Sequence, residues 1–83
     1  MKVPGKIQHV KAGNQEFLAI EQQFEVGREE WNEYKLLDGG TVRLKTNVQR
    51  IFRIVDEDAN QLYNEQEEPN LLVRHRTDVV TSL

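Results

Sequence analysis

Apolar and polar residues alternate along much of the chain, as they do in strands that turn one face toward a core. The stretch KIQHVKA, residues 6–12, predicts a short strand that ends at the turn signal GN. Near the other end, LLVRHRTDVV, residues 71–80, alternates more regularly and predicts the last strand. His9 and His75 fall in these stretches, and we expect both to be partly exposed strand residues without a ligand role.

The segment QEFLAIEQQFEVG, residues 15–27, also predicts a strand. Alternation places Phe17 and Ala19 on one face and Leu18 and Ile20 on the opposite face. In a short open sheet only one of these pairs has to face the core. We therefore expect the other pair to remain as spare apolar surface that association would cover.

The segment REEWNEYKLLDGGTVRLK, residues 28–45, fits two structures. A helix would align Trp31 with Tyr34, with acidic residues in its first turn and a glycine at its end. A hairpin would instead reverse the chain at Asp38-Gly39-Gly40, where Asp-Gly tolerates the positive φ angles of a primed turn. A strand rich in Thr and Val follows directly, so the hairpin is favoured.

The run NVQRIFRIV, residues 47–55, is equally ambiguous, because its apolar residues also match a helical spacing. Four of its nine residues are β-branched, and it contains no alanine, which favours extended chain. We predict a long strand over residues 41–55, bent by a bulge near residues 47–50.

These elements predict an all-β, mostly antiparallel fold, a small barrel or roll of about five strands, SH3-like or OB-like, with room for one short helix. The 83 residues, 37% hydrophobic and 30% charged, are enough for one domain with one modest core. We expect a single domain over residues 1–83, with residues 1–5 and 81–83 frayed.

Composition excludes several kinds of chemistry. The chain has no cysteine, which removes disulfides, thiolate catalysis and sulfur-ligated metals. Ser82 is the only serine and lies close to the end of the sequence, and the glycines form neither a phosphate loop nor a dinucleotide fingerprint. We expect no enzymatic activity and no cofactor. No apolar run suits a signal peptide or a membrane span, so a cytoplasmic location without membrane association is expected.

The acidic stretch VDEDANQLYNEQEE, residues 55–68, has two interpretations. In the twelve-position calcium loop, the side-chain ligands at positions 1, 3, 5 and 12 would be Asp56, Asp58, Asn60 and Glu67. Gln61, however, stands where that loop requires glycine. We favour a hydrated turn between strands, after which Leu62 or Tyr63 closes over the core.

Basic residues are enriched in the later strands, although the net charge is only −3. On one outer face they would bind the phosphates of a single-stranded nucleic acid, the residues being Arg43, Lys45, Arg50, Arg53, Arg74 and Arg76. Such binding also needs exposed stacking rings, and the chain has few aromatic residues, so nucleic acid is the less favoured partner. The expected function is non-enzymatic binding to a protein partner or to a second copy, as a homodimer.

Overall fold

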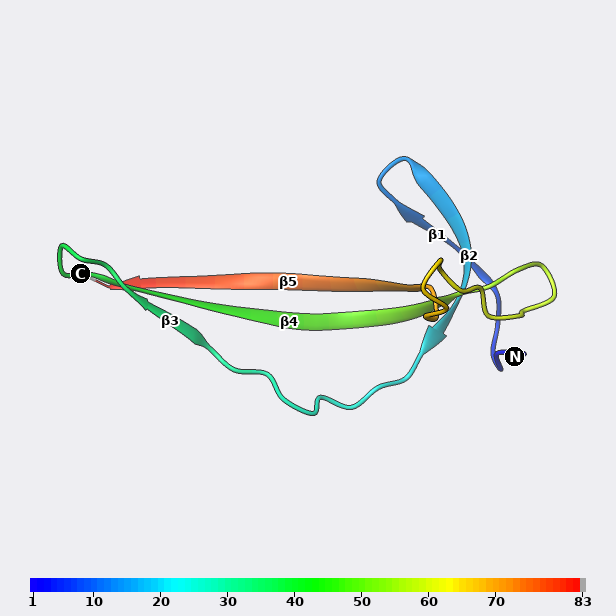
Figure 1. Ribbon diagram of the computed structural model, residues 1–83, viewed down its shortest axis with the longest axis horizontal. Coiled ribbons are helices and arrows are strands. Elements are labelled where there is room, and N and C mark those ends of the chain that lie inside the picture. Colours follow the sequence, from blue (N-terminus) through cyan, green and yellow to red (C-terminus); the bar gives the residue numbers. More distant parts are fainter. Residues whose placement is uncertain (83) are drawn as a thin grey trace. The chain divides into compact units, whose positions relative to one another are not determined.

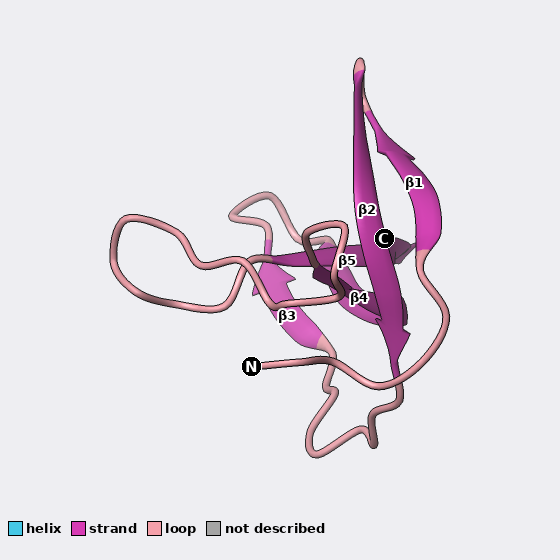
Figure 2. Ribbon diagram, turned by 90° about the vertical axis from the view of Figure 1, so that its right-hand side faces the viewer, coloured by secondary structure: helices cyan, strands magenta, loops and turns pink. Residues whose placement is uncertain are grey.

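A computed structural model describes residues 1–82 as strands and loops, without a helix in that range (Figure 2). The strands are β1 (Gln8–Ala12), β2 (Gln15–Gln22), β3 (Asn32–Lys35), β4 (Thr41–Ile54) and β5 (Leu71–Ser82). The all-β, antiparallel prediction is confirmed. Both ambiguous segments are extended: the first contains β3 and the second belongs to β4. The expected short helix is absent from residues 1–82.

The strands form an open sheet with the order β1-β2-β4-β3, and β5 also pairs with β4 (Figure 1). β1 and β2 form a hairpin, β2 continues the ladder along the last residues of β4, and β3 pairs with the first residues of β4. Closure into a barrel requires the outermost strands to pair with each other. The sheet is not closed, so the barrel is not confirmed. No helix within residues 1–82 has the length and apolar character needed to cross a membrane.

The β3–β4 hairpin is confirmed, but its turn differs from the expected one. The Leu36 N–H donates to the Gly40 carbonyl at 2.8 Å and the Gly39 N–H donates to the Leu36 carbonyl at 3.1 Å. These bonds enclose a loop of three residues, 37–39, in which only Gly39 has a positive φ, of 112°. The expected primed turn, with both Asp38 and Gly39 at positive φ, is wrong because only Gly39 adopts a positive φ in this loop.

The residues of the chain group into two compact units. The first unit consists of Met1–Phe24 and Arg50–Val73. The second unit consists of Glu25–Gln49 and the described residues from Arg74 onward. β4 and β5 contribute residues to both units.

The first unit contains the hydrophobic core, which covers both faces of β2. Ala19, 0% exposed, packs in one cluster with Val10, Phe52 and Ile54. Ile20, 2% exposed, packs in a second cluster with Val3 and Val55. Because Phe17 and Leu18 also pack against these clusters, the expectation that one face of β2 remains spare is wrong.

The chain before β1 explains why the second face of β2 is covered. The Val3 N–H donates to the Ala59 carbonyl at 2.8 Å, and Val3 is only 4% exposed. A side chain at Gly5, where φ is +118°, would place its Cβ only 2.8 Å from Ile20 Cγ2. Within residues 1–5, expected to fray, Val3 and Gly5 therefore pack against Ile20 of β2. At the other end, residues 81–82 belong to β5 and Leu83 lies outside the described residues.

The second unit has no buried apolar side chain among its described residues. Its exposed large apolar residues are Val26, Trp31, Tyr34, Leu36, Leu37, Val79 and Val80. Val42, Leu44 and Val48 are half-buried. Burial of apolar surface is the main favourable term in folding, so this unit leaves much of that free energy unrealised within one chain.

Candidate interaction surface

The acidic stretch folds as two consecutive tight turns, and the first is organised by Asp56. One Asp56 carboxylate oxygen accepts the N–H groups of Asp58, at 2.8 Å, and Asn60, at 2.9 Å. The Ala59 N–H donates to the Asp56 carbonyl, and Ala59 has a φ of 65°. The chain then re-enters the sheet through an antiparallel bridge between Val55 and Gln61. The predicted reversal of the chain is confirmed.

The second turn repeats the same arrangement eight residues later. Asn64 Oδ1 accepts the N–H groups of Gln66, at 2.9 Å, and Glu68, at 3.0 Å. The Glu67 N–H donates to the Asn64 carbonyl at 3.0 Å, and Glu67 has a φ of 62°. Short polar side chains that bond the following backbone are typical of such turns. An Asp or Asn at the first position of each turn is the signal that was missed in the sequence.

These two turns separate the residues proposed as calcium ligands. Asp56 and Asn60 belong to the first turn, whereas Glu67 is the left-handed residue of the second. Within residues 1–82, no group of three or more His, Cys, Asp or Glu side chains is placed to hold a metal ion. The oxygens of Asp56 instead bond to Asp58 and Asn60. Of the calcium set, the structure thus places Asp56, Asp58 and Asn60 in the first turn and Glu67 in the second.

Hydrogen bonding lowers the pKa of Asp56. The N–H of Asn60 is the largest cause, the N–H of Asp58 and the side chain of Asn60 add to it, and the positive charge of Lys2 acts in the same direction. Desolvation opposes this shift. The ionised carboxylate is therefore the form that holds the turn.

Gln61, 5% exposed, fills the position between the two turns where an apolar side chain was expected. Its Nε2 lies 3.1 Å from the Ile54 carbonyl, 2.8 Å from that of Leu62 and 3.1 Å from that of Asn70. Leu62 and Tyr63, expected to close over the core, are 40% and 50% exposed. That expectation is wrong, because it is Gln61 that is buried here, where three backbone carbonyls that also accept backbone N–H groups lie within reach of its amide.

Arg53 belongs to the same network. Its Nε donates to Gln22 Oε1 at 2.8 Å and one of its terminal nitrogens donates to Gln61 Oε1 at 3.1 Å. Arg53 is thus held within the first unit and is not presented to a phosphate. Arg50, also in the first unit, lies 4.0 Å from a Glu21 carboxylate oxygen.

The other four predicted phosphate-binding residues belong to the second unit. Arg43 and Lys45 gather at Trp31, with the guanidinium carbon 5.3 Å and the Lys45 Nζ 5.9 Å from the centroid of the indole ring. Such distances fit cation–π contacts. Arg76 pairs with Asp78 at 3.2 Å, and Arg74 also has a partner within the chain. The six basic residues are therefore divided between the two units, and Arg43 and Lys45 lie together at an aromatic ring.

The register of β3 on β4 divides the hairpin into two faces. Tyr34 lies opposite Val42 and Asn32 opposite Leu44, so this face carries mainly apolar residues. Glu33 lies opposite Arg43, on the face that also carries Lys45. Every residue of β3 is exposed. The hairpin therefore has one charged face and one apolar face, and neither is buried.

The chain before β3 is held to β4 by side chains. The Val48 N–H donates to a Glu29 carboxylate oxygen at 3.2 Å, so this carboxylate takes the place of a backbone partner. Between β4 and β5, the Asn47 side chain donates to Asp78 at 2.8 Å, and the hydroxyls of Thr46 and Thr77 lie 3.3 Å apart. The second unit is thus held mainly by backbone ladders and polar contacts.

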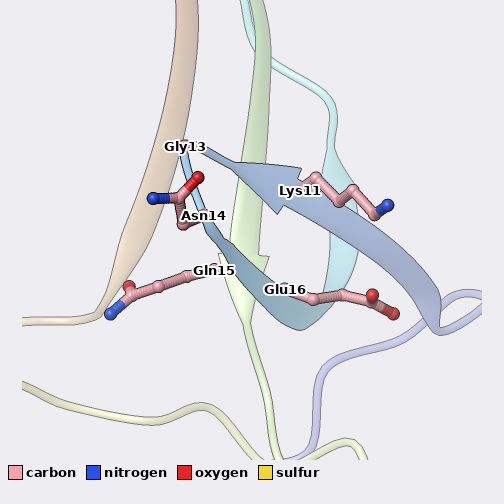
Figure 3. Close-up of a pocket in the computed structure, with 5 residues that line it drawn as sticks. All are labelled: Lys11, Gly13, Asn14, Gln15 and Glu16. Carbon is pink, nitrogen blue, oxygen red and sulfur yellow. The ribbon is translucent and has the colours of Figure 1, made fainter.

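A shallow hollow of about 350 Å³ lies at the turn of the β1–β2 hairpin and is lined by Lys11, Gly13, Asn14, Gln15 and Glu16 (Figure 3). Asn14 and Gln15 point to one side of the hairpin, whereas Lys11 and Glu16 point to the other. His9 Nδ1 lies 2.8 Å from a Glu16 carboxylate oxygen, and both side chains are exposed. A substrate pocket is mainly apolar with converging polar groups, and this hollow has neither property. His9 and His75 are exposed strand residues, as predicted.

No protein-family model, curated protein or solved structure matches this chain.

Proposed function

We propose that this protein is a small non-enzymatic binding domain that associates with another protein through its second unit. The favoured partner is a second copy of the chain. The observation that carries this proposal is the absence of any buried apolar side chain in the second unit among residues 1–82. Exposed apolar groups that gather on one element are typical of surfaces that a partner covers.

The charge of the second unit supports a protein partner. It contains six Lys and Arg residues and six Asp and Glu residues, so its formal net charge is zero. A surface with balanced charge does not repel a second copy, and proteins near zero net charge associate more readily. The first unit has five basic and eight acidic residues and carries the whole net charge of −3.

Sedimentation velocity from micromolar to millimolar concentration tests the proposal. We expect the protein to associate with rising concentration and the pair of substitutions Tyr34→Thr and Val80→Thr to weaken that association. A matched control is the pair Tyr63→Thr and Val73→Thr in the first unit. Tyr34 and Tyr63 are each 50% exposed, and Val80 and Val73 are 48% and 42% exposed. A strictly monomeric protein, or equal effects of both pairs, would contradict the proposal.

Single-stranded nucleic acid is the second candidate partner, and the cluster of Trp31, Arg43 and Lys45 favours it. An exposed indole beside two cations combines the stacking and phosphate contacts of single-strand binding. Trp31 is the only tryptophan, so its fluorescence reports directly on the site. Quenching by an oligonucleotide that weakens steeply with added salt would support this candidate. Unchanged fluorescence at low salt would eliminate it.

A further inference from the structure

We infer that the partner is a second copy of this chain, and that the two copies join by antiparallel pairing of their β3 strands about a twofold axis at Tyr34. This inference deepens the proposed function and rests on it. Three features of β3 in the second unit support it: the outer edge is free, the backbone groups of alternate residues point outward, and the charged residues follow in a fixed order.

The outer edge of β3 is open. β3 pairs with β4 on one side, and no second neighbour is present for it among residues 1–82. The Leu36 N–H bonds to the Gly40 carbonyl, which makes residues 36 and 40 a hydrogen-bonded pair of the antiparallel ladder. Alternation then turns the backbone groups of Asn32 and Tyr34 toward β4 and those of Glu33 and Lys35 outward.

The outward phase limits how a second β3 strand can pair symmetrically. Glu33 and Lys35 must face outward-turned residues of the other copy, so the twofold axis has to pass a residue and not the midpoint between two residues. An axis at Glu33 would set two glutamates opposite each other, and an axis at Lys35 would set two lysines opposite each other. An axis at Tyr34 sets Glu33 opposite Lys35 of the second copy twice, which is the only arrangement with opposite charges paired.

The axis at Tyr34 brings the two tyrosines into a non-hydrogen-bonded pair, where side chains are closest. The stretch EYK within β3 thus reads as self-complementary, with an aromatic centre flanked by two ion pairs. An interface of this length is at the small end of specific interfaces, so we expect a dissociation constant in the micromolar range.

Charge reversal tests this arrangement by sedimentation velocity on four samples of the full chain: the wild type, Glu33→Lys, Lys35→Glu, and an equimolar mixture of the two variants. Each variant alone sets like charges opposite each other at two positions, and we expect the dissociation constant to rise about tenfold or more. In the mixture, two lysines of one chain face two glutamates of the other. We expect the mixture to recover wild-type affinity as a heterodimer.

A backbone substitution gives an independent test. Lys35→Pro removes an outward N–H without removing a hydrogen bond to β4, so the β3–β4 hairpin is retained while dimerisation is lost. The circular dichroism and unfolding midpoint of each variant verify that it is folded. If the variants are unfolded, the charge-neutral pair Glu33→Gln and Lys35→Gln replaces them, with weaker dimerisation as the expected result.

The outcomes separate the inference from the proposed function. Variants that dimerise as tightly as the wild type, or a mixture that does not recover, would overturn pairing through β3 while leaving association by the second unit in place. A wild type that stays monomeric at millimolar concentration would overturn both.

Discussion

The residue that most decides the local structure of the first unit is Gln61. An amide nitrogen has two hydrogens, and here they are shared among three backbone carbonyls, while the amide oxygen accepts from Arg53. Ile54, Leu62 and Asn70 come from three successive passes of the chain, which also bond one another through their backbones, and the Gln61 amide adds a side-chain link among them. A buried polar network of this kind is favourable only while each member is bonded.

Gln61→Leu removes the side-chain donor that these carbonyls share in addition to their backbone N–H partners, and it removes the acceptor of one Arg53 nitrogen. We expect it to lower the free energy of unfolding by about 2 kcal/mol, measured by urea denaturation. Gln66→Leu is the matched control, because Gln66 is exposed and bonds to Asn64 through its backbone only. The control should change stability by less than about 0.5 kcal/mol. Equal effects of the two substitutions would show that Gln61 is not the bonded centre of this region.

Asp56 predicts a pH dependence of stability. Its pKa is lower in the folded protein than the ordinary value of 3.8, because the Asn60 and Asp58 N–H groups bond to the ionised form. As the pH falls, the unfolded state takes up the proton first, so the contribution is complete above 3.8 and is lost as the pH falls through the lower folded value.

Asp56→Asn keeps an oxygen acceptor, as Asn64 does in the second turn, but removes the titrating group. We expect the variant to remain folded and to lose stability less steeply than the wild type below pH 3.8, in urea titrations across that range. A wild type and variant with parallel pH profiles would contradict the role given to the carboxylate.

At the scale of elements, three loops share one backbone design. Residues 36–40, 56–60 and 64–68 each have an N–H of the first residue bonded to the carbonyl of the fifth, and a left-handed fourth residue. That fourth residue is Gly39, Ala59 or Glu67. Only glycine adopts this region without steric cost.

Glu67→Gly therefore relieves backbone strain, and because Glu67 is exposed no packing is lost. We expect the free energy of unfolding to rise by about 0.5–1 kcal/mol. The greater conformational entropy of glycine in the unfolded chain offsets part of this gain. Gly39→Ala is the reverse experiment in the loop of the β3–β4 hairpin and should lower stability by about 1 kcal/mol. Chemical denaturation of both variants measures these changes, and a stabilising Gly39→Ala would contradict the shared loop design.

The strands could be predicted from the sequence because their signals are local. Alternation and β-branched residues located β4 and β5, and the DGG signal located the β3–β4 hairpin. The sequence predicted a turn in the acidic stretch but not the two separate turns, because Ala59 and Glu67 are residue types that rarely adopt a left-handed conformation. The burial of Gln61 was not predicted, because the three carbonyls that its side chain bonds lie apart in sequence and come together only in the folded chain.

The core also depended on contacts that a local pattern does not contain. Alternation correctly divided Ala19 from Ile20, but it could not show that Val3 and Val55 cover Ile20 on the second face of β2. The basic residues were predicted as one set, and the fold assigned Arg53 to a network inside the first unit. The sequence therefore shows how many basic residues there are, but not which of them lie together in the folded protein.

At the scale of the whole molecule, the two units differ in how they are stabilised. The first has two apolar clusters and a satisfied polar network, whereas the second has ladders and polar contacts without a buried apolar side chain in the described chain. Elements with few buried apolar contacts open at lower free energy than core strands. In dilute protein the amides of the second unit should therefore exchange faster than those of the first.

Amide hydrogen exchange at two protein concentrations tests most directly the claim that the second unit completes its packing by association. We predict that raising the concentration from micromolar to millimolar slows exchange in the second unit, above all at the outward amides of Glu33 and Lys35, and leaves the first unit unchanged. Exchange in the second unit that is independent of concentration and already as slow as in the first would contradict the account.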